Sequence, residues 1–180
     1  MSIHESPKLI LYIAISLDGF IAKPDGDTSW LSIVEKDGED YGYADFLASV
    51  ETIIVGRKTF DKIMSMGFDY TSNGKTIYVI SHNEIANNVN VKFYSGDLKK
   101  LVKNLKENNT RNIYCDGGAE IVNSFLLKNL FDELIISIIP ILLGEGISLF
   151  KNGLPEQYLT LLEVCHYKKG LVQLHYKVNF

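Results

Sequence analysis

The sequence predicts an α/β protein whose central sheet is mostly parallel and ends in a C-terminal antiparallel hairpin. From residue 9 to residue 140, strand-like apolar runs alternate with segments of helical spacing, which is the order typical of parallel sheets. Some of these runs, such as 53–55, are apolar at every position, as in strands covered on both faces. The last segment, 171–180, instead alternates apolar and polar residues, which indicates a half-buried antiparallel strand.

Each element follows from a local pattern. Apolar residues recur at helical spacing in 43–50, and Asp97 can cap a helix whose apolar face lies in 98–105. Gly170 can supply the positive φ of a tight turn between the last two strands. We expect strands at 9–17, 51–56, 75–81, 90–95, 111–118, 132–140, 159–167 and 171–180, and helices at about 40–49, 57–64, 98–105 and 119–126. Because no repeat or linker interrupts this order, residues 1–180 are expected to form a single domain.

Composition excludes several classes of protein. The 180 residues are 46% apolar and 22% charged, which is the balance of a globular domain with a proper core. The net charge is -4 and the basic clusters are no longer than pairs, so we expect no nucleic-acid partner. The apolar run 9–17 is too short to span a bilayer and lacks a signal-peptide cleavage site, so we expect no membrane association and a cytoplasmic location.

The histidines and cysteines do not favour a metal site. The four histidines show no ligand spacing with each other or with the two cysteines, so no metal is expected. Cys115 and Cys165 lie in separate strand-like runs, and two thiols in a reducing compartment are a better interpretation than a disulfide.

Two of the predicted strands end in short turns that lead directly into helices. Residues 56–59 read Gly-Arg-Lys-Thr, and residues 116–119 read Asp-Gly-Gly-Ala. In open parallel sheets, ligands bind beyond the carboxyl ends of the strands, where helix N-termini favour anions. Two such turns favour an elongated ligand with several phosphates, such as a dinucleotide.

Each turn also has a simpler interpretation. Paired glycines before a helix are often only a tight turn, and Arg57 with Lys58 is often a solvated helix start. Neither the G-x-G-x-x-G fingerprint nor a Walker A loop occurs, so ordinary Rossmann and P-loop proteins have little support.

Four motifs, in order, resemble one known superfamily. They are AISLDGFIA at 14–22, VGRKTF at 55–60, CDGGAEIV at 115–122 and DELIISIIPILLGEG at 132–146. Together they resemble the dihydrofolate reductase superfamily, and within it the reductase domain of the bifunctional riboflavin-biosynthesis deaminase–reductase and its stand-alone relatives. The resemblance covers nearly the whole chain, and it implies a dihydrofolate-reductase-like three-layer fold and NADPH as the cofactor.

The resemblance also implies roles for single residues. Arg57 would hold the 2′-phosphate of the adenosine ribose, with Thr59 and the helix-start amides on the pyrophosphate. The paired glycines would pass close under the pyrophosphate and the nicotinamide, and in this family they are often joined by a cis peptide. The carboxamide of the nicotinamide would meet the backbone of the first strand and the loop after it. The expected cofactor-binding residues are Ala14, Ile21, Gly56, Arg57, Lys58, Thr59, Ser81, Gly117, Gly118 and Ala119.

The proton donor is less directly indicated. In the riboflavin-pathway relatives an acidic residue before the paired glycines contacts substrate, which makes Asp116 the first candidate. Folate-type reductases carry a carboxylate on their first helix. Counting back from Gly56 reaches Asp40 or Tyr41, whereas counting forward from Trp30 reaches Glu35. Asp40 and Asp116 can each also be explained as a helix or turn cap.

The sequence therefore predicts an NADPH-dependent reductase of a heterocyclic or ribosyl-type small molecule. The resemblance points to 5-amino-6-(5-phosphoribosylamino)uracil reductase of riboflavin biosynthesis, although the zinc-binding pattern of the deaminase half is absent from the sequence. A dihydrofolate or pterin reductase, or a nucleotide-binding module without turnover, are the alternatives. The apolar run 132–143 and the habits of the relatives also suggest a homodimer.

Overall fold

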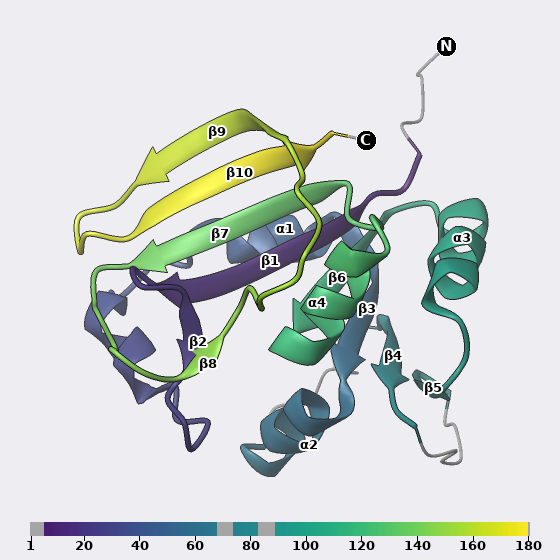
Figure 1. Ribbon diagram of the computed structural model, residues 1–180, viewed down its shortest axis with the longest axis horizontal. Helices are drawn as coiled ribbons and strands as arrows, with labels where there is room; N and C mark the ends of the chain where they lie inside the picture. The colour runs from purple at the N-terminus through teal and green to yellow at the C-terminus, as the bar shows by residue number, and fades with distance from the viewer. Residues whose placement is uncertain (1–5, 68–73, 83–88, 180) are drawn as a thin grey trace.

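The computed structural model describes residues 6–67, 74–82 and 89–179, and its centre is one eight-stranded sheet (Figure 1). The strand order is β5-β4-β3-β6-β1-β7-β10-β9. The strands are β1 (Leu9–Ser16), β3 (Val50–Gly56), β4 (Thr76–Ile80), β5 (Val91–Tyr94), β6 (Asn112–Gly117), β7 (Glu133–Ile139), β9 (Leu159–His166) and β10 (Val172–Val178). The first six in this order pair in parallel, and β10 and β9 add antiparallel pairs. The predicted α/β fold with a C-terminal antiparallel hairpin is confirmed.

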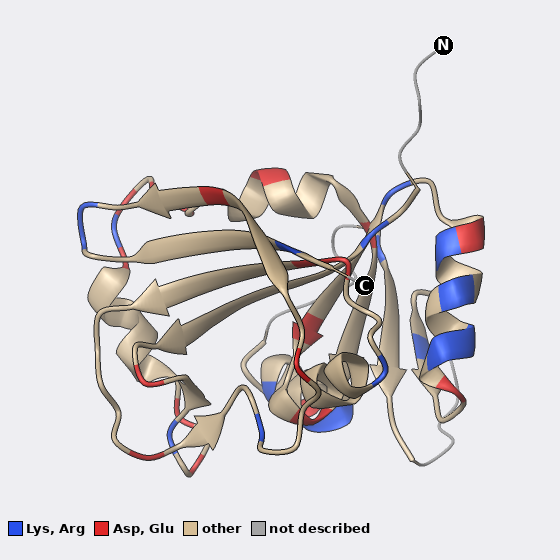
Figure 2. Ribbon diagram, turned by 45° about the horizontal axis from the view of Figure 1, so that its top comes forward, with Lys and Arg blue, Asp and Glu red and all other residues tan. Residues whose placement is uncertain are grey.

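Helices cover both faces of the sheet and make three layers. The helices are α1 (Tyr43–Ala48), α2 (Arg57–Ser65), α3 (Leu98–Asn108) and α4 (Ala119–Leu127), with a 3-10 helix η1 at Ser29–Val34. On one face, α3 and α4 pack on sheet residues such as Leu11 and Ile113. On the other face, Phe46 of α1 and Phe60 of α2 pack with Val55 and Ile77. The charged residues of α3 gather on its solvent side, as its apolar stripe predicts (Figure 2).

Several local predictions are confirmed. Asp97 is the N-cap of α3, where its carboxylate accepts the backbone N–H of Lys100 at 2.9 Å. Gly170 has φ +86° in the turn between β9 and β10, and both cysteines are free thiols. Within the described ranges, none of the helices is long and apolar enough to cross a membrane.

One local prediction is corrected by long-range packing, and another is made more specific. The segment after β1, expected as a loop, contains β2 (Phe20–Ala22), which pairs with β8 (Ile147–Ser148) apart from the main sheet. The polar side of β10 is partly covered: Gln173 donates to the Tyr12 hydroxyl at 2.9 Å and His175 bonds Glu133 at 2.8 Å, whereas Lys177 is exposed. The alternating pattern therefore marks a face that polar partners cover in part, and a period of two cannot show which of its residues are covered.

Candidate functional site

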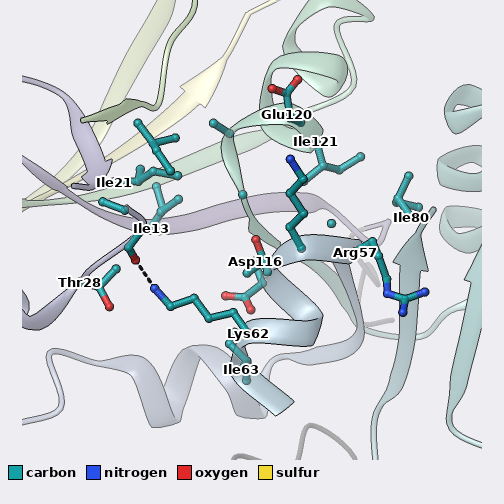
Figure 3. Close-up of a pocket in the computed structure, with 18 of the residues that line it drawn as sticks. Ile13, Ile21, Thr28, Arg57, Lys62, Ile63, Ile80, Asp116, Glu120 and Ile121 are labelled. Atoms are coloured by element: carbon teal, nitrogen blue, oxygen red, sulfur yellow. Dashed lines mark hydrogen bonds between the residues drawn. The ribbon is translucent and has the colours of Figure 1, made fainter. Parts of the chain in front are cut away.

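A cavity of about 1930 Å³ opens along the carboxyl ends of the central strands (Figure 3). Ligand pockets commonly measure about 300–1,000 Å³, so this cavity can take an elongated ligand together with a second molecule. Of the residues predicted for the site, these line it: Ala14, Ile21, Gly56, Arg57, Lys58, Thr59, Ser81, Asp116, Gly118 and Ala119. Asp40 and Gly117 are not among the lining residues.

The two glycine-containing turns adjoin each other at the floor of this cavity. Strands β3 and β6 are neighbours in the sheet, with Val55 opposite Gly117. A Cβ atom added to Gly56 would lie 3.5 Å from the Gly117 carbonyl oxygen, and one added to Gly118 would lie 2.9 Å from Thr59 Oγ1. The peptide bond between the two paired glycines is cis, as the resemblance implied. The N-termini of α2 and α4 thus open side by side on one cavity, a suitable place for a pyrophosphate.

Arg57 lies at one end of the cavity, near Ile80 (Figure 3). Its Nε donates to both carboxylate oxygens of Asp61 at 2.7 Å, one helical turn further along α2. Its guanidinium carbon lies 5.4 Å from the centre of the Phe93 ring, which β5 supplies. Ser81, at the end of β4, is buried at the same end of the cavity. A fixed guanidinium at this position suits a phosphate group.

Asp116 lies on the side of β6 that faces α1, because it is two residues from Tyr114 along the strand. The buried Tyr114 hydroxyl donates to Asp116 Oδ1. Tyr43, at the start of α1, lines the cavity, and its ring centre lies 6.4 Å from that of Tyr114, so two phenols lie beside the carboxylate. Burial, followed by the charge of Asp116, raises the pKa of Tyr43 to about 12, and burial also raises the pKa of Tyr114.

The sequence reasoning missed both tyrosines. Tyr114 could have been found, since residues two apart on a strand share a face. Tyr43 could not, because only the packing of α1 against β6 brings its ring to within 6.4 Å of the Tyr114 ring centre.

Two other carboxylates, those of Asp40 and Asp18, have structural contacts. Asp40 accepts the backbone N–H groups of Gly42 at 3.0 Å and Ala44 at 2.9 Å, so its carboxylate binds the backbone at the start of α1, outside the cavity. Asp18 accepts from Ser16 Oγ at 2.6 Å and from the Gly144 backbone at 2.7 Å. The hydrogen bond from Ser16 is the main cause that lowers the pKa of Asp18. Asp18 therefore joins the loop after β1 to the loop after β7.

No cluster of three or more metal-ligating side chains occurs in residues 6–67, 74–82 and 89–179. The residues of the cavity instead fit a dinucleotide: paired glycines leave room where a side chain would stand, two helix N-termini adjoin, and a cation lies at one end. The order of the strands, with a cavity across their carboxyl ends, places this chain in the class of dihydrofolate-reductase-like domains.

Within this class, the chain belongs to the RibD C-terminal domain family, whose model matches residues 7–173. The chain is 40% identical over 172 residues to the uncharacterized protein YwjB of Bacillus subtilis (strain 168), covering 94% of this chain and 97% of that protein. A solved structure from Shewanella sp. PV-4, named provisionally as a riboflavin biosynthesis protein, is 28% identical, with a TM-score of 0.86 and coverage of 96% of this chain and 99% of that one.

A bifunctional protein of Thermotoga maritima shares the fold. It is a diaminohydroxyphosphoribosylaminopyrimidine deaminase and 5-amino-6-(5-phosphoribosylamino)uracil reductase. At 16% identity its TM-score is 0.71, and the match covers 97% of this chain but 57% of the bifunctional one. The predicted superfamily and reductase-domain resemblance are confirmed, and the chain is a relative of riboflavin-pathway reductases.

Proposed function

We propose that this protein is an NADPH-dependent reductase that transfers hydride to a heterocyclic or ribosyl-type small molecule. The observation that carries the proposal is the shared cavity, in which Arg57 and the two glycine turns lie together with Asp116. The reductase named in the Thermotoga maritima protein makes 5-amino-6-(5-phosphoribosylamino)uracil the first candidate substrate.

Residues at one end of the cavity would bind the cofactor, and residues at the other end would bind the substrate. Arg57 and the adjoining helix N-termini would bind and orient the phosphates of the cofactor, with Lys58 as an additional charge. When bound, the nicotinamide cofactor supplies the hydride. Asp116 would accept hydrogen bonds from a sugar hydroxyl or a ring N–H of the substrate. The Tyr43 hydroxyl would contact the substrate beside it, and the buried Tyr114 would hold the carboxylate in place.

The protein would therefore contribute to catalysis mainly by positioning the nicotinamide and the substrate, not by forming a covalent bond to either. A nicotinamide and a substrate held in one cavity react as an intramolecular pair, which removes much of the entropic barrier. Apolar side chains from three elements, Ile13, Ile21 and Ile121, line the same cavity and help exclude water from it.

The test of this proposal is selective binding of NADPH. Arg57→Ala should cost NADPH about 1.5–3 kcal/mol of binding free energy, the range for a hydrogen bond to a charged group. NADH, which lacks the 2′-phosphate, should bind nearly as it does to the wild type. Calorimetric titration with both nucleotides measures this, and equal losses would refute the role of Arg57. Oxidation of NADPH with each candidate substrate then tests turnover; binding without turnover of any candidate would favour a nucleotide-binding module.

We also propose that the protein is a cytoplasmic homodimer. Its interface would be the edge strand β9, not β7, whose apolar sequence first suggested a dimer. The apolar run 132–143 contains β7, which lies inside the sheet between β1 and β10. By contrast β9 is an edge strand, and its Leu159, Leu161, Leu162 and Val164 are 41–51% exposed. Pairing with a second copy would cover this edge. Sedimentation equilibrium of wild type and Leu161→Lys tests the dimer: the wild type should be dimeric and the variant monomeric, and a monomeric wild type would refute the dimer.

The proposed cytoplasmic location agrees with the free thiols of Cys115 and Cys165, which are compatible with a reducing compartment.

A further inference from the structure

The Arg57 guanidinium is restrained on two sides by neighbouring side chains. Asp61 accepts from its Nε with both carboxylate oxygens at 2.7 Å, which fixes the edge of the group nearest the backbone. Phe93 lies under its face, 5.4 Å from the guanidinium carbon to the ring centre. Phe93 is held in turn by Phe60 of α2, with the two ring centres 6.0 Å apart and the planes at 84°.

These contacts use only part of what a guanidinium can donate. An arginine side chain has five N–H donors, and the bonds to Asp61 use the one on Nε. Within the described part of the chain, the protein hydrogen bonds of Arg57 are made by Nε, so the two Nη groups remain for a ligand. Those two groups form the fork that binds two oxygens of a phosphate at once.

The alternative explanation is that Asp61 only supports the helix. An exposed ion pair four residues apart on a helix contributes little to stability. Arg57 and Asp61 are 38% and 51% exposed, so their pair belongs to this weak class. Loss of the pair should therefore leave the fold intact, which separates a positioning role from a structural one.

Two opposed effects decide what Asp61 does to a bound phosphate. Its charge repels the phosphate, but water and salt screen charges at an exposed site, and Asp61 contacts the guanidinium on the Nε side. Its hydrogen bonds also remove rotamer freedom from Arg57 before the ligand arrives, so less entropy is lost on binding. We expect the second effect to be larger.

We propose that Asp61 and Phe93 are positioning residues that select a 2′-phosphorylated nucleotide by holding the Arg57 guanidinium with its Nη edge available to the phosphate. This inference rests on the proposed NADPH-dependent function and adds the two side chains that set the choice between NADPH and NADH. Neither residue need touch the cofactor, because both act through Arg57.

The experiment is calorimetric titration of wild type, Asp61→Asn and Phe93→Leu with NADPH and with NADH. Asp61→Asn should weaken NADPH binding about three- to tenfold, the range for fixing one long side chain in advance. Phe93→Leu should weaken it about two- to fivefold, the range for an exposed cation–π contact. NADH affinity should not change in either variant. The matched control is Glu107→Gln, which removes another exposed ion pair of the same spacing, Lys103–Glu107 on α3, and should change neither affinity.

A second set of variants identifies the route of the effect. In an Arg57→Ala background, Asp61→Asn should no longer weaken NADPH binding and should strengthen it slightly, because only the repulsion by the carboxylate remains. An equal loss in both backgrounds, or parallel losses for NADPH and NADH, would overturn the positioning role while leaving the NADPH-dependent function in place. Wild-type protein that binds neither nucleotide would instead overturn the proposed function, and with it this inference.

Discussion

The two turns at the floor of the cavity have the same strand–glycine–helix structure, but the helices that follow them differ in how deeply they are buried. Each joins a parallel strand to a helix of nine residues through glycine, and the two turns touch. Helix α2, after Gly56, has no fully buried residue, whereas α4, after Gly118, buries most of its length. Phe125 of α4 is fully buried in the core shared with α3, and Met64 of α2 is 44% exposed.

The difference indicates that the core fixes one turn and surface contacts fix the other. Helix α4 is held by apolar packing, so changes to its buried side chains should affect folding and the site together. The α2 turn carries Arg57, whose position depends on Asp61 and on Phe93. Changes to the exposed Arg57 and Asp61 should therefore alter nucleotide binding while leaving stability nearly unchanged.

The largest expected effect compares the two helices directly. Phe125→Ala should lower the free energy of unfolding by about 3–5 kcal/mol, because it leaves a cavity in a close-packed core. Met64→Ala, on the exposed side of α2, should stay within about 0.5 kcal/mol. Urea denaturation of both variants measures this. Similar losses at the two positions would mean that the helices are supported alike.

A smaller effect is expected at the contact between the turns. A Cβ at Gly118 would lie 2.9 Å from Thr59 Oγ1, so Gly118→Val should displace Thr59 and fill the space meant for the cofactor. Ligand at 100 times its Kd stabilises a protein by about 2.7 kcal/mol, or roughly 5–10 °C in Tm for a chain of this size. We expect wild type to show this shift with NADPH and Gly118→Val to fold but show none. An unaltered shift would place the cofactor elsewhere.

Asp116→Asn separates substrate contact from cofactor binding. The carboxylate lies toward α1 and accepts from Tyr114, so NADPH affinity should stay the same or rise slightly. Turnover of the true substrate should fall at least about tenfold, equivalent to roughly 1.4 kcal/mol of transition-state stabilisation. The matched control is Asp97→Asn, where asparagine should cap α3 nearly as well and activity should persist. Wild-type turnover in Asp116→Asn would remove Asp116 from the site.

The smallest effect concerns pH and the phenols beside Asp116. The pKa of Tyr43 is raised to about 12 in the folded chain, against about 10 when unfolded. Its protonated form therefore contributes stability below pH 10, and this contribution is lost as pH rises from 10 toward 12. Urea denaturation between pH 9 and about 11 should show stability falling in wild type and falling less steeply in Tyr43→Phe. The control is Tyr158→Phe. Because Tyr158 is 72% exposed, this variant should show the same fall of stability with pH as wild type.

Local sequence determined much of this protein. Unbroken apolar runs such as 53–55 predicted buried strands, glycine followed by helical spacing predicted the two turns, and Asp97 predicted a cap. Each depends on residues within a few positions of one another, since burial of both faces, positive φ and N-capping are local requirements. Most of the candidate cofactor residues, which the resemblance implied, lie in these two turns, and all of those except Gly117 line the cavity.

Only the tertiary structure decided how those pieces meet. The strand order places β6 beside β3 although β4, β5 and α3 lie between them in the chain, and this brings Gly117 opposite Val55. The same packing brings Tyr43 to Tyr114 and puts Phe93 under Arg57, and it leaves Asp40 outside the cavity, at the start of α1. The physical reason is that hydrophobic burial is non-directional. The apolar pattern therefore shows which faces of an element are covered, but the register and order of the strands determine which other elements cover them.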